Sequence, residues 1–316
     1  MEQVNTPAVV TQPPAASKLP GKKKRKNWEL FIIALPLMIL VLMFSYVPLC
    51  GWIISLFEYK PGRALFDCRY VGLKYFQMFL TDRDVYRVLK NTVIFSGIGY
   101  LLSPLPMLFA LGLNEIGNAR FKKVAQTTTT LPYFISMIIV YSLAFAMFSS
   151  DGVLNTVLKS LGGAGNTNLL MNKKIVYLFQ TCITQWKNLG WNAIIYIAAI
   201  AGIDQEQYEA AMIDGAGRFR CALHITLPGI MPTFLVLFLL SIAHFVSTGF
   251  EQYFVFKNPI VASKIEVLDL YIYNMGLKLF DYSYSTAVGI IKSAISVVLL
   301  FAANTLAKRV RGTAII

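Results

Sequence analysis

Six apolar stretches, each close to the length that crosses a lipid bilayer, constrain this chain more than any other feature of its sequence. They lie at about residues 30–57, 88–113, 131–148, 183–203, 230–247 and 287–307. A transmembrane helix needs roughly 20 predominantly apolar residues. Only 14% of the 316 residues are charged, whereas a soluble domain carries about 25%. The sequence therefore predicts an all-α integral membrane protein with six transmembrane helices.

The segments between and around these stretches predict how the chain is organised. We expect a disordered basic tail, a first transmembrane helix with an external loop, a five-helix core that contains a charged loop at 204–229, and a short second tail: residues 1–27, 28–87, 88–307 and 308–316. Two pairs of prolines should kink the first span and interrupt the second (Pro36, Pro48; Pro104, Pro106).

Basic residues predict the orientation. The net charge is +13, and five basic residues precede the first span, while Lys308, Arg309 and Arg311 follow the last. Such clusters favour the cytoplasmic face and contact anionic lipid, and this distribution argues against nucleic-acid binding. We therefore expect both termini in the cytoplasm, together with the basic loop near Arg120 and the loop 204–229. The loops 58–87, 149–182 and 248–285 should then be external.

Motifs that would indicate an enzyme are missing from the sequence. The four cysteines form no C-x-x-C pair, and with only His224 and His244 there is no H-E-x-x-H. We expect no metal and no cofactor. The sequence also lacks the Gly-rich P-loop that binds ATP. The alternatives to a membrane-embedded enzyme are a transport subunit driven by another chain and a stand-alone secondary transporter of a small polar solute. The spans lack the carboxylates on which many ion-coupled carriers rely.

The loop 204–229 is the most strongly patterned segment in the second half of the chain. Residues 205–213 should form a short helix whose acidic start suits a helix N-terminus. Gly215 should stop this helix, and a second helix should then run toward Pro228. A helix–glycine–helix elbow is shaped to dock into a groove of another protein, although an ordinary interfacial elbow has the same pattern.

This segment resembles a known family. Glu209-Ala210-Ala211, then three residues, Gly215, nine residues and Ile225-x-Leu227-Pro228 is similar to the EAA motif of ABC import permeases. The segments YVPLCGWIISLFEYKPG, LPYFIS and FEQYFVFKNPIV resemble one branch, the LplB-like carbohydrate permeases, whose cargo is oligosaccharide or polysaccharide fragments.

The resemblance implies a type I ABC importer permease fold in a bacterial cytoplasmic membrane. It implies four partners: cytoplasmic ABC ATPase subunits, a second homologous permease, an extracytoplasmic solute-binding protein and the carbohydrate. The elbow would be the ATPase contact, formed by Glu209, Ala210, Ala211, Asp214, Gly215 and Ala216, with Leu227 and Pro228 ending it. Small alanines permit close approach, and Glu209 can accept charge-assisted hydrogen bonds.

Polar and aromatic residues within the spans are candidates for the translocation path: Tyr141, Trp191, Asn192, Tyr196, His244, Phe245 and Lys292. Lys292 would line the path or a gate, or else extend its ammonium group to the external headgroups. His244 would contact sugar, or else form an interhelical hydrogen bond.

Overall fold

The computed structural model describes residues 28–163, 165 and 167–311, so the predicted tail 1–27 lies outside the described residues. In this part of the chain the fold is helical, with a single isolated antiparallel bridge between Phe57 and Tyr70. The chain divides into two compact units, Met1–Gly51 and Trp52–Ile316.

The described part of the first unit is one apolar helical stretch. It comprises α1 (Trp28–Val41), a π-helical turn (Leu42–Tyr46) and the start of a 3₁₀ segment (Val47–Leu56). Pro36 lies inside α1, and Pro48 lies at the start of the 3₁₀ segment. Nearly all the side chains of residues 31–50 are exposed, so their apolar surface is left for lipid or protein to cover.

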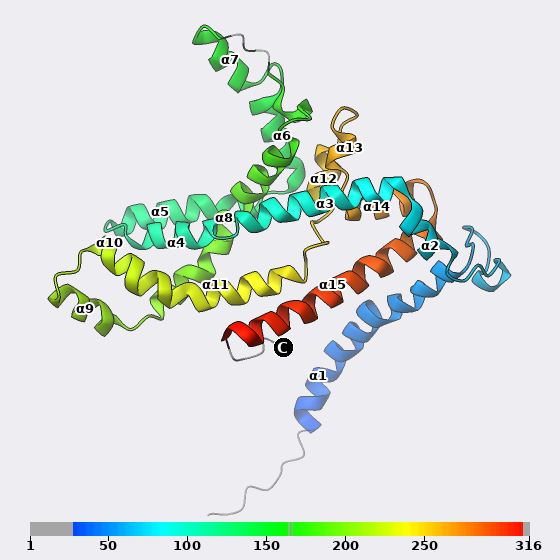
Figure 1. The fold of residues 1–316 in the computed structure, drawn as a ribbon, viewed down its shortest axis with the longest axis horizontal. Coiled ribbons are helices and arrows are strands. Elements are labelled where there is room, and N and C mark those ends of the chain that lie inside the picture. Colours follow the sequence, from blue (N-terminus) through cyan, green and yellow to red (C-terminus); the bar gives the residue numbers. More distant parts are fainter. Residues whose placement is uncertain (1–27, 164, 166, 312–316) are drawn as a thin grey trace, which may run out of the picture. The chain divides into compact units, whose positions relative to one another are not determined.

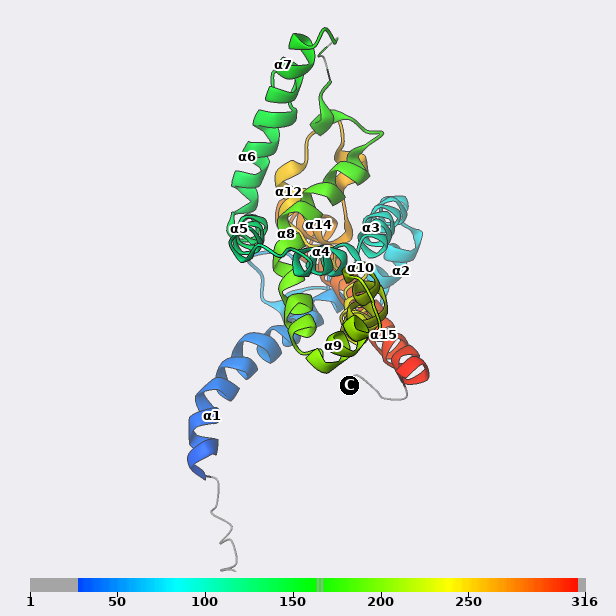
Figure 2. The ribbon, with the colours of Figure 1, turned by 90° about the vertical axis from the view of Figure 1, so that its left-hand side faces the viewer.

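The second unit is built around α8 (Val176–Ala201). Before it come α2 (Lys74–Thr81), α3 (Arg83–Leu101), α4 (Leu105–Asn114) and α5 (Ala119–Thr130). The α3–α4 break lies at Pro104, as predicted. Both α4 and α5 pack against α8 and cross it (Figures 1 and 2). At Gly190 the α8 backbone approaches Thr129 and Thr130 of α5 so closely that an added Cβ would lie 2.3 Å from the Thr129 carbonyl.

Helix α5 was not predicted, because residues 119–130 read as a basic loop. Asn118 caps this helix by accepting hydrogen bonds from the amides of Arg120 and Phe121 (3.0 and 3.2 Å). Four consecutive threonines, 127–130, have low helix propensity. Packing against α8 overrides that propensity.

Lys187 of α8 fixes the connection from α5 to α6. Its ammonium group donates hydrogen bonds to the main-chain carbonyls of Pro132, Tyr133 and Ile135, at 2.5–3.2 Å. These carbonyls belong to a 3₁₀ turn (Leu131–Phe134) and the residue after it. Helices α6 (Met137–Phe148) and α7 (Val153–Ser160) follow and extend away from α8 (Figures 1 and 2).

The C-terminal half contains α9 (Gln205–Ile213), α10 (Arg218–Cys221), α11 (Leu227–Ile242), α12 (Glu251–Phe256), α13 (Ala262–Ile265), α14 (Leu268–Tyr273) and α15 (Tyr282–Arg311). The predicted loop 248–285 is therefore a folded segment rather than a loop. Val261, Ile265, Val267, Leu268 and Leu270 are fully buried within it, so apolar packing holds it together.

Five helical stretches in the described chain are long and apolar enough to cross a membrane: Phe31–Leu56, Arg83–Asn114, Met137–Ser160, Arg218–Ile242 and Tyr282–Arg309. The predicted span at 183–203 lies in α8, which has 26 residues. At about 1.5 Å rise per residue α8 is long enough to cross, but Lys187 and several amide side chains lower its hydropathy. The predicted fifth span ends early, because α11 stops at Ile242 instead of continuing to residue 247.

Candidate functional site

The predicted elbow is confirmed as a short helix stopped by a glycine. Asp204 caps α9 by accepting a hydrogen bond from the Glu206 amide (3.0 Å). Gly215 has a φ of +75°, a left-handed conformation that β-branched residues rarely adopt. The Ala216 amide then donates to the Ala211 carbonyl (2.8 Å) and closes the turn.

The elbow is fastened on one side and open on the other. The hydroxyls of Tyr208 and Thr226 lie 2.9 Å apart, and Thr226 is fully buried, so α9 is tied to the helical stretch that leads to α11. On the open side, Met212, Ile213 and Phe219 are exposed by 60%, 87% and 78%. Large apolar side chains this exposed form a surface suited to a protein partner.

Six predicted contact residues lie together on α9 and its terminal turn: Glu209, Ala210, Ala211, Asp214, Gly215 and Ala216. Leu227 and Pro228 lie apart from them, in the first turn of α11. They do not end the elbow, because the helical stretch continues through them after a π-helical turn (Ala222–Thr226). The Leu227 amide bonds to the Ala222 carbonyl, and Pro228, which has no amide hydrogen, is tolerated in a first helical turn.

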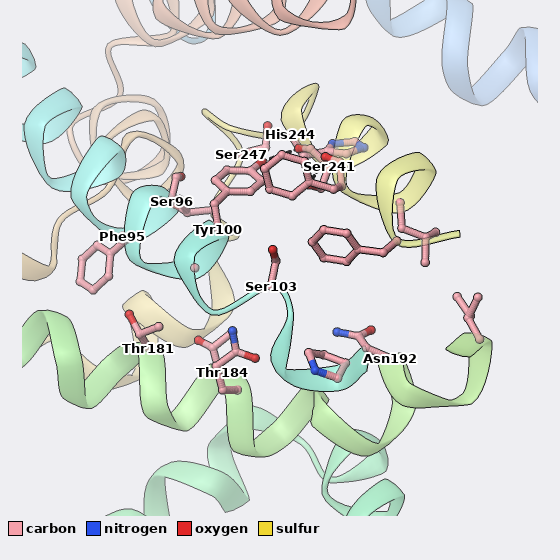
Figure 3. Close-up of a pocket in the computed structure, with 18 of the residues that line it drawn as sticks. Phe95, Ser96, Tyr100, Ser103, Thr181, Thr184, Asn192, Ser241, His244 and Ser247 are labelled. Atoms are coloured by element: carbon pink, nitrogen blue, oxygen red, sulfur yellow. Dashed lines mark hydrogen bonds between the residues drawn. The ribbon is translucent and has the colours of Figure 1, made fainter. Parts of the chain in front are cut away.

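A cavity of about 450 Å³ lies between α3, α8, α11 and the residues that follow α11 (Figure 3). Its polar lining includes Ser96, Thr181, Thr184, Asn192 and His244. The described residues that line it include no Asp, Glu, Lys or Arg. The cavity therefore offers hydroxyl, amide and aromatic groups without a fixed charge.

Hydroxyl groups of α3 bond to carbonyls at the end of α11 and just beyond it. Tyr100 donates its hydroxyl hydrogen to the Ser241 carbonyl, and Ser96 donates to the Phe245 carbonyl. The Ser241 carbonyl also accepts a hydrogen bond from the His244 amide (2.8 Å). Helix α11 ends at Ile242, and residues 243–250, here called the linker, run to α12 beside the cavity.

Three predicted path residues line this cavity: Asn192, Tyr196 and His244. Phe245 is not among the lining residues, but its ring stacks on that of Tyr100, which is, with centroids 5.5 Å apart and an interplanar angle of 11°. Figure 3 shows Asn192 projecting from α8 and His244 from the opposite side.

The other three predicted path residues do not line the cavity. Tyr141 packs edge-on against Phe256 (5.1 Å) in the apolar core. Trp191 stacks on Tyr133 at 4.4 Å, with an interplanar angle of 2°. Lys292 forms an ion pair with Asp269 of α14.

Sequence reasoning missed most of the hydroxyl groups in the cavity, including Ser96, Thr181, Thr184, Ser241 and Ser247. Isolated serines and threonines on apolar helices give little signal. A signal did exist on α8, where polar residues recur at helical spacing: Thr181, Thr184, Gln185, Asn188 and Asn192. Such a stripe faces one side of a helix.

Carboxylates hold the folded segment of α12–α14 against its neighbours. Glu266 pairs with Arg87 of α3 and with Lys257 (3.3 and 2.9 Å). Burial alone would raise the pKa of the Asp82 carboxyl, but hydrogen bonds from the Asp84 amide and from the hydroxyls of Tyr271 and Tyr284 hold that pKa below its ordinary 3.8.

Comparison with known proteins gives a consistent result. A family model described as "Binding-protein-dependent transport system inner membrane component" matches residues 102–312. The chain is 39% identical to Protein LplB of Bacillus subtilis (strain 168) over 288 residues, 90% of each chain. It is also 39% identical to the polygalacturonan/rhamnogalacturonan transport system permease protein YteP of the same organism, with 89% of this chain and 88% of YteP covered.

A solved structure agrees with these relatives. A chain of a bacterial alginate ABC transporter, crystallised with an alginate pentasaccharide-bound periplasmic protein, superposes with a TM-score of 0.84 and 31% identity. The match covers 92% of this chain and 98% of that chain. The predicted ABC importer permease fold is thereby confirmed. With its apolar helices, its elbow and these relatives, the chain belongs to the family of binding-protein-dependent transport system inner membrane components, and it is a permease of an ABC importer.

Proposed function

We propose that this chain forms half of a path that carries an oligosaccharide or polysaccharide fragment into a bacterial cell, and that it couples this path to a separate ATPase. Relatives are named for polygalacturonan/rhamnogalacturonan and arabinooligosaccharides. The observation that carries the proposal is the cavity between α3, α8 and α11, with its hydroxyl, amide and aromatic lining.

The chemistry of that lining suits a sugar. Serine and threonine hydroxyls donate and accept hydrogen bonds, and an asparagine amide does both at fixed positions. Sugar hydroxyls need such partners when they leave water, because an unpaired polar group costs free energy. Tyr100 and Phe238 supply apolar ring surface on the same cavity. The second half of the path would come from a homologous permease.

The elbow supports the coupling role. Glu209 and Ala210 are exposed on α9, beside the exposed Ile213. A carboxylate at this place can accept charge-assisted hydrogen bonds from a partner, while the apolar side chains lose their contact with water. No P-loop occurs in this sequence, and the proposal therefore assigns ATP hydrolysis to another chain.

Orientation follows from the same proposal. The elbow and both termini would face the cytoplasm, and α12–α14 would face the solute-binding protein outside. ATP-driven closure of two ATPase subunits would draw the elbows together and open the path outward. Hydrolysis and product release would then reset it inward.

Co-purification tests the coupling. We would extract the tagged chain gently from its native membrane and identify its partners for the wild type, Glu209→Lys and Gly215→Val. Glu251→Lys, which reverses an exposed charge on α12, is the matched control. The expected result is a P-loop ATPase and a second permease with wild type and control, and depletion of the ATPase in the two elbow variants. Purification of the wild type without an ATPase would overturn the coupling role.

Uptake tests the cargo. Proteoliposomes that contain the assembled importer and its binding protein would be offered oligogalacturonides, rhamnogalacturonan fragments, arabino-oligosaccharides and alginate oligosaccharides. ATP-dependent accumulation of one of them supports the proposal. Accumulation driven by an ion gradient without ATP would instead favour a stand-alone secondary transporter.

A further inference from the structure

The ion pair between Lys292 and Asp269 lies inside the protein. Lys292 belongs to α15, one of the stretches apolar enough to span a membrane, and Asp269 belongs to α14. Their side chains are only 20% and 15% exposed. An ionised group at such a place needs a partner, and here each supplies the other. Neither lines the cavity between α3, α8 and α11.

The second oxygen of the same carboxylate reaches the linker. The Gly249 amide donates a hydrogen bond to Asp269 Oδ2 at 3.2 Å, while Lys292 contacts Oδ1. Gly249 has a φ of +90°, so the chain turns sharply at the point where the carboxylate holds it. Lys292 thus orients Asp269, and Asp269 holds Gly249.

The linker is also part of the cavity wall. His244, Ser247 and Thr248 line the cavity. The beginning of the linker is fastened to α3, because Ser96 donates to the Phe245 carbonyl. Its end is fastened through Gly249 to Asp269. Ser247 and Thr248 lie between these two attachments, so their positions depend on both, whereas His244 directly precedes the first attachment.

We propose that Lys292 and Asp269 are positioning residues for the cargo cavity: their ion pair holds the Asp269 carboxylate on the Gly249 amide and thereby fixes the part of the linker that carries Ser247 and Thr248. The inference rests on the proposed function insofar as the cavity is the cargo path. The hydrogen bond from the Gly249 amide to Asp269, held in place by Lys292, is here called the tether. Loss of the tether weakens cargo recognition, whereas the elbow and its ATPase contact stay intact.

Two double variants isolate the tether, and both avoid an unpaired buried charge, which would be strongly destabilising by itself. Asp269→Leu/Lys292→Leu removes the ion pair and the acceptor for the Gly249 amide. Asp269→Asn/Lys292→Met removes the charges but keeps an oxygen that can accept that hydrogen bond. Lys257→Met is the control, because it removes an ion-pair cation from the same segment without touching the linker.

Hydrogen exchange of the assembled importer, detected by mass spectrometry, measures how firmly the tether holds the linker. We expect amides of the linker to exchange at least tenfold faster in the Leu/Leu variant than in wild type. In the Asn/Met variant and in the control, their exchange rates should stay within about threefold of the wild-type rates. Unchanged linker exchange in the Leu/Leu variant, or equally fast exchange in both double variants, overturns the tether.

The effect of the tether on cargo recognition is measured as uptake of the oligosaccharide that the wild type accumulates fastest. The half-saturating concentration should rise at least fivefold in the Leu/Leu variant, with the ATPase still co-purifying, and should return toward wild type in the Asn/Met variant. An unchanged half-saturating concentration together with faster linker exchange overturns the positioning role. If the wild type accumulates none of the oligosaccharides, the proposed function fails, while the exchange measurement still decides whether the tether exists.

Discussion

Gly190→Ala tests the close contact between the backbones of α8 and α5. Gly190 is buried where α8 meets α5, and an alanine Cβ would lie 2.3 Å from the Thr129 carbonyl carbon and oxygen and 2.5 Å from the Thr130 nitrogen. Ordinary contact begins near 3.4 Å, so the two helices must separate by about 1.1 Å. The atoms that are struck belong to the backbone, and no side-chain rotation relieves the clash.

The magnitude follows from two opposing effects. Replacing glycine by alanine inside a helix stabilises by about 1 kcal/mol through propensity. Overpacking costs typically 1–3 kcal/mol, and a clash with backbone falls at the upper end. We therefore expect a net destabilisation of about 2 kcal/mol, which corresponds to a fall in Tm of roughly 4–8 °C for a domain of this size.

Thermal unfolding of the purified chain in detergent measures this effect. Gly97→Ala is the control, because Gly97 lies within α3 and a Cβ there would meet nothing within 4 Å. The control should keep or slightly raise the Tm. Equal Tm values for Gly190→Ala and Gly97→Ala would refute the close contact between α5 and α8.

Three further perturbations test other parts of the structure. Lys187→Met leaves three carbonyls without their cationic donor and should lower the free energy of unfolding by about 3 kcal/mol. Thermal unfolding measures this effect, and the control Lys159→Met, on the exposed end of α7, should change the Tm little. The pKa of Asp82 is lowered in the fold, so its contribution to stability is present above pH 3.8 and is lost as the pH falls through the folded pKa. The Tm of Asp82→Asn should therefore depend less on pH in acid than the Tm of the wild type, and identical profiles would contradict this. Phe280 is 59% exposed and has a φ of +59°, a conformation that Asn tolerates better than Phe. Phe280→Asn should therefore raise the free energy of unfolding by about 1 kcal/mol, and a lower Tm would show that the contacts of the ring outweigh the backbone strain.

Local chemistry made the elbow predictable. The bounds 205–213 follow from an acidic start and a glycine stop, because both act within one or two helical turns. Helix α5 was not predictable in this way. Asn118 caps it locally, but its threonines disfavour a helix, and it packs against the α8 backbone at Gly190, some 60 residues later in the chain. Long-range contact of this kind leaves no local pattern.

The candidate path residues also differ in whether local sequence or only long-range contact reveals their role. Lys292 was expected in the path or at the headgroups, because an apolar span gives no indication of its partner. The partner, Asp269, lies in the segment 248–285, which read as a loop and contains buried helices. His244 and Asn192, which the sequence singles out as candidates, line the cavity, whereas Ser96 and Tyr100 act through hydrogen bonds to carbonyls that only the fold reveals.

The position of Lys187 bears on how the protein is made. The translocon inserts helices into the bilayer according to their apolarity, and a lysine at a helix centre costs about 2.5–3.5 kcal/mol. Lys187 is near the middle of α8, so α8 is a poor candidate for insertion by itself. Its three carbonyl acceptors lie at residues 132–135, which leave the ribosome earlier. The order of synthesis therefore makes the acceptors available before the lysine arrives, and biogenesis of the membrane domain can proceed without exposing that charge to lipid.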